Sequence, residues 1–225
     1  MKKTLITAAC IALASVASAQ KGTGGSGAIL EVGDGNAASG GIGATVVGSD
    51  YNPTNGTTDL VVDISGTESW DGALDPSNTI LNVGIPGSAV TGIGWDVTVA
   101  TVGASWLSEA VMSFQGEINL TVGLGDDFAG TASYDSGGAV VVFADIPLPD
   151  IIIAGGSMPV EFFESFDDVA DAVDAVFTSG SITVRYEGGA AVPTVSEWGL
   201  IILTAMLLLG VVMMSLKSRN QPVTA

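Results

Sequence analysis

The sequence predicts an all-β protein whose central region, residues 20–190, is an antiparallel β-sandwich. From Ile93 to Val99 every second residue is a large apolar one, which is the period of a strand with one buried face. Further short apolar runs follow along the chain, with turn residues roughly every 8–12 positions. Glycine contributes 31 of the 225 residues, which suits a chain with many tight turns. Two packed sheets would bury such alternating faces against each other.

The first elements are two short apolar runs at 28–32 and 44–47, which we predict to be edge strands joined by long loops. The residues around them are rich in Gly, Ser, Asn and Thr, and these residue types supply the backbone angles that turns need. Strand signals strengthen from residue 59, with predicted strands at 59–64 and 79–85.

Three alternating runs follow at 89–101, 106–114 and 118–124, separated by short turns. Consecutive strands joined by short turns usually pair, so this segment is predicted to be an antiparallel meander. Trp95 is in phase with the inward-facing residues and is expected in the core.

The second half of the central region is less regular. We predict a loop over 125–138, a strand over 140–146 that ends at Pro147, a brief apolar return at 151–153, a strand over 160–166 and a last strand over 181–186. Gly188 and Gly189 then open a linker.

The segment 165–180 is the exception to the β pattern. Its apolar residues recur at helical spacing, and four aspartates fall on the opposite side: Phe166, Val169, Ala170, Val173 and Phe177 against Asp167, Asp168, Asp171 and Asp174. Ser165 is suited to cap the N-terminus of a helix, and Gly180 is suited to end it. We predict a three-turn amphipathic helix, with a functional loop as the alternative.

Composition excludes several classes of function. Residues 20–191 hold 23 Asp or Glu against Lys21 and Arg185, and the whole chain has a formal net charge of −18. Such a surface repels nucleic acid, so DNA or RNA binding is not expected. The chain has no histidine, which excludes a Ser–His–Asp triad, and we predict that the protein is not an enzyme. Its one cysteine, Cys10, leaves residues 20–190 without a disulfide.

Calcium is the ligand that the acidic loops would suit best, because it is bound by carboxylate and carbonyl oxygens. Two clusters are candidates: Asp126, Asp127 and Asp135 in one loop, and Asp167, Asp168, Asp171 and Asp174 in another. Neither has the spacing of an EF-hand, and solvated acidic loops are the alternative interpretation.

Residues 1–19 have the order of a signal peptide read by the Sec export machinery. Lys2 and Lys3 form the basic start, an apolar stretch covers 5–16, and the small residues Ala17 and Ala19 mark the cleavage site. The mature protein is therefore predicted to begin at Gln20.

The other end of the chain holds a predicted transmembrane helix. No charged residue occurs from Trp198 to Leu216, and a helix over this stretch would be roughly 28 Å long, close to the thickness of a bilayer core. Lys217 and Arg219 follow it and favour a cytoplasmic C-terminus, which would leave the central region outside the inner membrane.

A polar motif stands directly before this stretch: Val192, Pro193, Thr194, Val195, Ser196, Glu197, Trp198 and Gly199. Motif, apolar stretch and short basic tail together resemble the IPTL-CTERM type of C-terminal sorting signal, a relative of the PEP-CTERM signals of Gram-negative bacteria. Val192 stands where that family has Ile, and Val195 where it has Leu. The resemblance implies an exosortase-like membrane protease as a partner, and delivery to the cell surface or the medium after a stay in the inner membrane. A plain single-span anchor is the alternative.

Residues 160–186 also resemble the closing half of the jelly-roll domain that accompanies subtilisin-like proteases. This resemblance implies that the β-sandwich is jelly-roll-like, and it implies nothing about activity. The central region is expected to have one of two functions. It is a structural protein of the cell surface or extracellular matrix, or it is a binding module for extracellular polysaccharide, with Trp70 or Trp106 as a stacking platform.

Overall fold

The structure is a computed structural model that describes residues 27–188, 202 and 204–206. The chain divides into two compact units, Met1–Gly188 and Gly189–Ala225. In the second unit the described residues are helical. The predicted signal peptide, the sorting motif over 192–199 and the flanking Lys217 and Arg219 lie outside the described residues. None of the helices within the described residues is long and apolar enough to cross a membrane.

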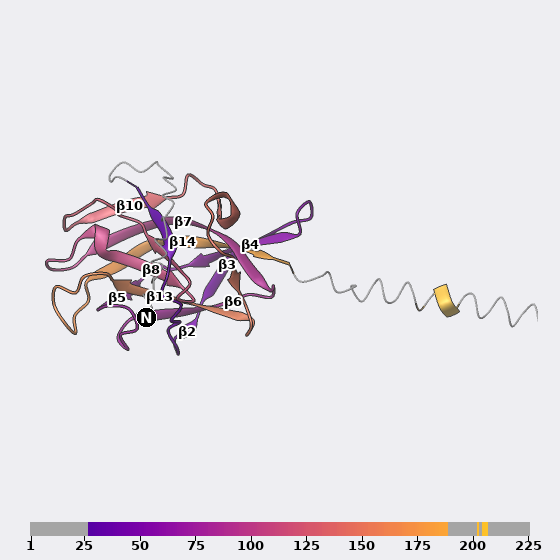
Figure 1. Cartoon of the computed structure of the whole chain (residues 1–225), viewed down its shortest axis with the longest axis horizontal. Helices are drawn as coiled ribbons and strands as arrows, with labels where there is room; N and C mark the ends of the chain where they lie inside the picture. Colours follow the sequence, from indigo (N-terminus) through magenta and orange to yellow (C-terminus); the bar gives the residue numbers. More distant parts are fainter. Residues whose placement is uncertain (1–26, 189–201, 203, 207–225) are drawn as a thin grey trace, which may run out of the picture. The chain divides into compact units, whose positions relative to one another are not determined.

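The first unit is built from two β-sheets, which confirms the all-β sandwich (Figure 1). The first sheet has six strands, in the spatial order β1 (Ile29–Val32), β9 (Ile118–Thr121), β8 (Ala110–Phe114), β13 (Ser157–Glu164), β6 (Thr79–Gly84) and β2 (Ile42–Gly43). Its strands are antiparallel except β2, which pairs in parallel with β6. The likeness to a jelly roll stays a prediction.

The second sheet has eight strands and two long central ones. Its main path is β10 (Thr131–Asp135), β7 (Ala89–Thr101), β14 (Ala175–Glu187), β4 (Thr57–Asp63) and β3 (Thr45–Asn52); β11 (Val141–Val142) and β12 (Ile151–Ile152) also pair with β7, and β5 (Thr67–Ser69) pairs with β14. Two short 3-10 helices complete the unit, η1 (Leu107–Glu109) and η2 (Phe143–Asp145). As predicted, the two short apolar runs at 28–32 and 44–47 form edge strands, since β1 and β3 each end a sheet.

The core lies between the sheets. Phe162 on β13 and Phe177 on β14 meet edge to face with their ring centres 5.1 Å apart, so each sheet contributes one ring to the contact. Both are fully buried, and burial of one such ring contributes about 1.5–3 kcal/mol. Trp95 is 4% exposed and belongs to the same core, as its alternating position predicted.

The predicted meander is wrong at its first step. β8 and β9 do form an antiparallel hairpin, but in the first sheet, whereas β7 lies in the second. The chain crosses between the sheets over residues 102–109, where the Val102 N–H donates to the Asp174 carbonyl at 2.7 Å. The alternation of β7 shows which of its faces is buried, but both sheets need such a face, and the sequence does not say which sheet a strand joins.

The predicted helix over 165–180 is also wrong. Residues 165–174 form turns and bends, and β14 begins at Ala175, well before the predicted strand at 181. Phe166 is 63% exposed and Phe177 is fully buried, so the two do not share one apolar face. Gly180 lies inside β14 with φ +119, where a β-carbon would meet the Asp96 backbone. The register of β14 against β7 shifts just before this residue, between Phe177 and Ser179.

Two further segments differ from prediction. The loop predicted over 125–138 contains β10, which pairs with β7 from Thr131 to Asp135. The strand predicted over 140–146 is reduced to the two residues of β11, after which η2 turns the chain and buries Phe143. Pro147 and Pro149 follow closely and cannot donate to a sheet, which limits pairing here.

Candidate functional site

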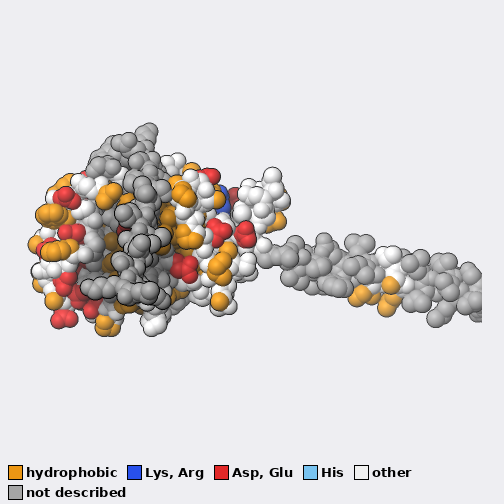
Figure 2. Space-filling view, viewed as in Figure 1, with side chains coloured by type: hydrophobic (Ala, Val, Ile, Leu, Met, Phe, Trp, Pro, Cys, Tyr) orange, Lys and Arg blue, Asp and Glu red, His pale blue; other side chains and the backbone are white. Residues whose placement is uncertain are grey.

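Three aspartates meet at the end of the sandwich where β5, β13 and β14 come together. One carboxylate oxygen each from Asp71, Asp167 and Asp174 lies within 4.8 Å of the other two. Asp71 and Asp174 are buried and Asp167 is exposed. We call these three residues the acidic cluster. Acidic side chains also gather at the lower left of Figure 2, over the end where Figure 1 places β5.

Backbone hydrogen bonds bring the three segments together. Asp71 follows β5, and its carbonyl accepts from the N–H of Glu164 at the end of β13 (3.0 Å). Asp174 directly precedes β14, and its N–H donates to the Ser69 carbonyl (2.9 Å). The positions of the two buried aspartates are therefore set by the ends of sheet strands rather than by a free loop.

Glu164 is the buried neighbour of the cluster. It is 1% exposed, and neither of its carboxylate oxygens has a hydrogen-bond partner within the described residues. Burial, followed by the nearby Asp174 carboxylate, raises the pKa of Glu164 to about 9. Asp174 is 2% exposed; its Oδ1 accepts from the Ser105 hydroxyl at 3.1 Å, whereas its Oδ2 has no partner in the portion of the chain that the structure describes.

Asp71 is held from the loop between β13 and β14. The Asp171 N–H donates to both carboxylate oxygens of Asp71, at 3.0 and 3.2 Å. Asp171 has φ +61, a left-handed conformation unusual for a residue with a side chain, and this bend points its N–H at Asp71. Burial raises the pKa of Asp71, the hydrogen bond from the Asp171 N–H opposes this rise, and the charges of Asp167, Asp75 and Asp171 add to it.

Residues 27–188 hold no basic side chain that is free to balance these charges. Arg185 is the only Lys or Arg in this range, which holds 23 Asp or Glu. Its guanidinium pairs with both oxygens of Asp59 at 2.7 Å, across from β14 to β4, and this contact raises the pKa of Arg185. Among the described residues, only protons or ions from solution can therefore neutralise the acidic cluster.

The cluster overlaps only partly with the predicted calcium ligands. Asp167 and Asp174 belong to it, Asp171 contributes its backbone N–H, and the exposed Asp168 is not a member. Sequence reasoning missed Asp71 and Glu164. Asp71 stands alone in a Ser-Trp-Asp-Gly segment, and Glu164 continues the alternation of a strand, so no local spacing marks either residue as a ligand.

The other predicted set is engaged in separate hydrogen bonds. The buried Asp126 accepts from the Tyr134 hydroxyl at 2.8 Å, which raises the pKa of Tyr134 beyond its already large shift from burial. Asp127 accepts from the Ser108 hydroxyl at 2.8 Å, and Asp135 accepts from the Gly137 N–H in its own turn at 2.7 Å. Among the residues described, the three do not form a group close enough to share one ion.

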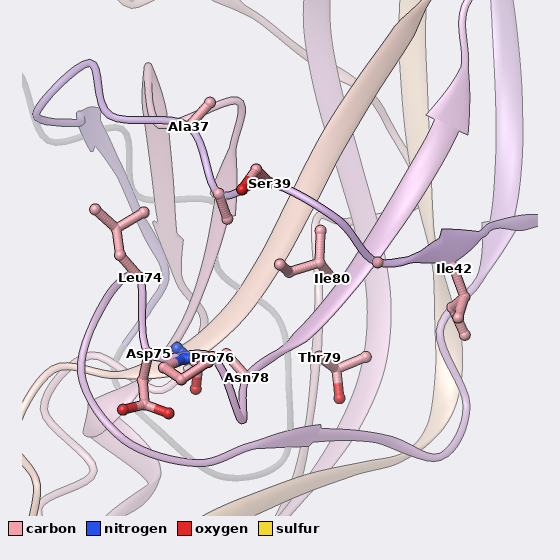
Figure 3. A pocket seen from close by; sticks show the side chains of 11 residues that line it. Ala37, Ser39, Ile42, Leu74, Asp75, Pro76, Asn78, Thr79 and Ile80 are labelled. Atoms are coloured by element: carbon pink, nitrogen blue, oxygen red, sulfur yellow. The ribbon is translucent and has the colours of Figure 1, made fainter.

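Two hollows flank the loop over 71–78. One, of about 490 Å³, is lined by residues that include Asp71, Asp167 and Asp171, and it opens the cluster to solvent. The other, of about 590 Å³, lies on the side of Ala37, Ser39 and Ile80 (Figure 3). Asp75 is the one ionisable side chain among the described residues in the walls of this larger pocket, so it offers a shaped surface with little charge to orient a ligand.

The two candidate stacking tryptophans differ in exposure. Trp106, just before η1, is 44% exposed, whereas Trp70 is half-buried. Trp106 is thus the better presented of the two.

Comparison with known protein families gives one match, over residues 190–216, to the IPTL-CTERM motif. The chain carries an IPTL-CTERM sorting signal. This confirms the resemblance seen in the Pro-Thr-Val-Ser-Glu-Trp-Gly motif and the apolar stretch behind it. The match covers the C-terminal segment and not the sandwich. Comparisons with curated proteins and with solved structures found no significant match.

Proposed function

We propose that this is an exported protein of the cell surface or extracellular matrix, without catalytic activity, delivered through its IPTL-CTERM signal. The observation that carries the proposal is the motif match at residues 190–216, because a C-terminal sorting signal is needed only by a protein that leaves the cytoplasm. The acidic sandwich fits this destination, since 23 acidic side chains keep it soluble and away from anionic membrane surfaces.

The proposed route has three steps. The Sec machinery exports the chain and residues 1–19 are removed at Ala19. Residues 198–216 then hold the protein in the inner membrane, with Lys217 and Arg219 on the cytoplasmic side. An exosortase-like protease finally acts at the motif, and the sandwich continues to the surface or the medium.

Pro193 is the residue on which recognition should depend most. Its ring fixes φ near −65° and biases Val192 toward an extended backbone, the conformation in which proteases bind a chain. Trp198 would sit at the membrane interface and hold the motif at a set depth.

The test compares Pro193→Ala with Pro222→Ala, which changes a proline beyond the motif. We expect Pro193→Ala to insert normally but to accumulate in the inner membrane as a larger, unprocessed form. Pro222→Ala should be processed like wild type. Equal masses and equal membrane fractions for wild type and Pro193→Ala would mean that residues 192–219 are only an anchor.

A second candidate function is binding of extracellular polysaccharide, favoured by the exposure of Trp106. An indole face in solvent can stack on a sugar ring. Retention on a glycan affinity gel that is lost in Trp106→Ala and kept in Phe166→Ala, which removes another exposed aromatic ring, would support this function. A wild-type protein that is not retarded would exclude it for the glycans tested.

A further inference from the structure

We propose that Asp71, Asp167 and Asp174 form a binding site for one calcium ion at the end of the sandwich. The site joins two segments that are far apart in the sequence: the segment that follows β5, with Asp71, and the loop between β13 and β14, with Asp167 and Asp174. The proposal does not depend on the sorting signal, because it rests on the sandwich alone.

The spacing of the acidic cluster fits a single ion. Calcium binds oxygens at about 2.3–2.6 Å, so two of its ligands lie at most about 5 Å apart. The three carboxylate oxygens of Asp71, Asp167 and Asp174 lie within 4.8 Å of one another. Carboxylates this close repel each other unless something positive lies between them.

A second observation points to a ligand independently of the cluster. Within the described residues, Glu164 is 1% exposed with both oxygens unpartnered, and the buried Asp174 keeps Oδ2 unpartnered. Buried acidic oxygens without partners are strongly unfavourable, and a cation held by the acidic cluster would give the Asp174 carboxylate a partner.

The surroundings exclude the usual protein partner for buried carboxylates. Arg185 is the only basic residue in 27–188 and is engaged with Asp59. A single proton shared by Glu164 and Asp174 would relieve that pair, but it would leave Asp71 and Asp167 uncompensated. One divalent cation can contact the carboxylates of Asp71, Asp167 and Asp174 together.

The donors select a hard cation and favour calcium among these. They are all oxygens, since the chain has no histidine and its cysteine lies in the predicted leader. Calcium accepts an irregular set of six to eight oxygens, whereas magnesium demands a near-ideal octahedron. The hollow of about 490 Å³ beside Asp71 and Asp167 leaves room for water to complete the coordination.

The experiment measures calcium binding by titration calorimetry on the chelator-stripped full-length chain in a non-ionic detergent. Asp167→Asn is compared with Asp168→Asn, because the two residues are adjacent and exposed, and each variant removes one charge from the same loop. We expect Asp167→Asn to weaken calcium binding by about tenfold or more and Asp168→Asn to change it less than about twofold. Magnesium should bind wild type at least about tenfold more weakly.

Both variants should keep the wild-type melting temperature in chelator, since neither side chain is buried. Asp71→Asn provides a second test at a buried ligand, with the same expected loss of calcium affinity. Absence of calcium binding to wild type at millimolar concentration would overturn the proposal. Equal affinities of the Asp167 and Asp168 variants, or equal responses to calcium and magnesium, would also overturn it, because they indicate mere screening of the acidic surface.

Discussion

Truncation of Phe177 tests whether the two sheets are joined through the contact between their aromatic rings. Phe177 is fully buried and its ring contacts Phe162 of the opposite sheet, so Phe177→Ala removes both burial and an edge-to-face contact. Replacing a buried Phe by Ala costs about 3–5 kcal/mol, because the neighbours cannot close the cavity completely. For a domain of this size each kcal/mol lowers the melting temperature by about 2–4 °C, which gives a decrease of roughly 6–20 °C.

The matched control is Phe166→Ala. Phe166 and Phe177 would share one buried face in a helix over 165–180, but in the structure Phe166 is 63% exposed. Its truncation should therefore change the free energy of unfolding by less than about 0.5 kcal/mol. Thermal unfolding followed by circular dichroism on the full-length chain measures both variants. Similar losses of stability in Phe166→Ala and Phe177→Ala would contradict the start of β14 at Ala175 and would favour a helix over 165–180.

Two further predictions concern the interior. Glu164 in the folded protein holds its proton more tightly than in the unfolded chain, so in chelator its contribution to stability is complete below pH 4.5 and is lost as the pH rises toward about 9. Glu164→Gln should flatten this decline in urea unfolding measured across that range, and an unchanged slope would contradict the assignment. Gly180→Ala should destabilise the protein by about 1–3 kcal/mol, because φ is +119 and the new β-carbon meets the Asp96 backbone. Gly84→Ala in β6, where a β-carbon has open space, is the control, and equal effects of the two changes in denaturant unfolding would argue against the constrained backbone at Gly180.

The elements of the fold that could be predicted are those where local pattern and burial coincide. The alternation from Ile93 to Val99 predicted a half-buried strand and the burial of Trp95, because a period of two has one structural meaning. The helix predicted over 165–180 was wrong because local pattern and burial do not coincide there. Its apolar residues have helical spacing, yet its conformation is set by hydrogen bonds to Ser69 and Asp71, about a hundred residues away.

Only the residues in the loop between β13 and β14 could be predicted as part of the candidate site. Asp167 and Asp174 stand in an acidic run that any search for calcium ligands would notice. Asp71 and Glu164 carry no such signal, because each becomes a neighbour of Asp174 only when β5 and β13 come together at the end of the sandwich. The sorting signal, by contrast, could be predicted completely from the sequence, because its motif is a run of consecutive residues and does not depend on the fold.

The intact mass of the mature protein recovered from cells tests the central claim most directly, because it fixes both ends of the chain at once. Export and processing predict a chain that begins at Gln20 and has also lost roughly 30 C-terminal residues, or about 3 kDa. A mass corresponding to residues 20–225 would contradict processing at the sorting signal and leave a membrane anchor. A mass that includes Met1 would contradict the export step itself.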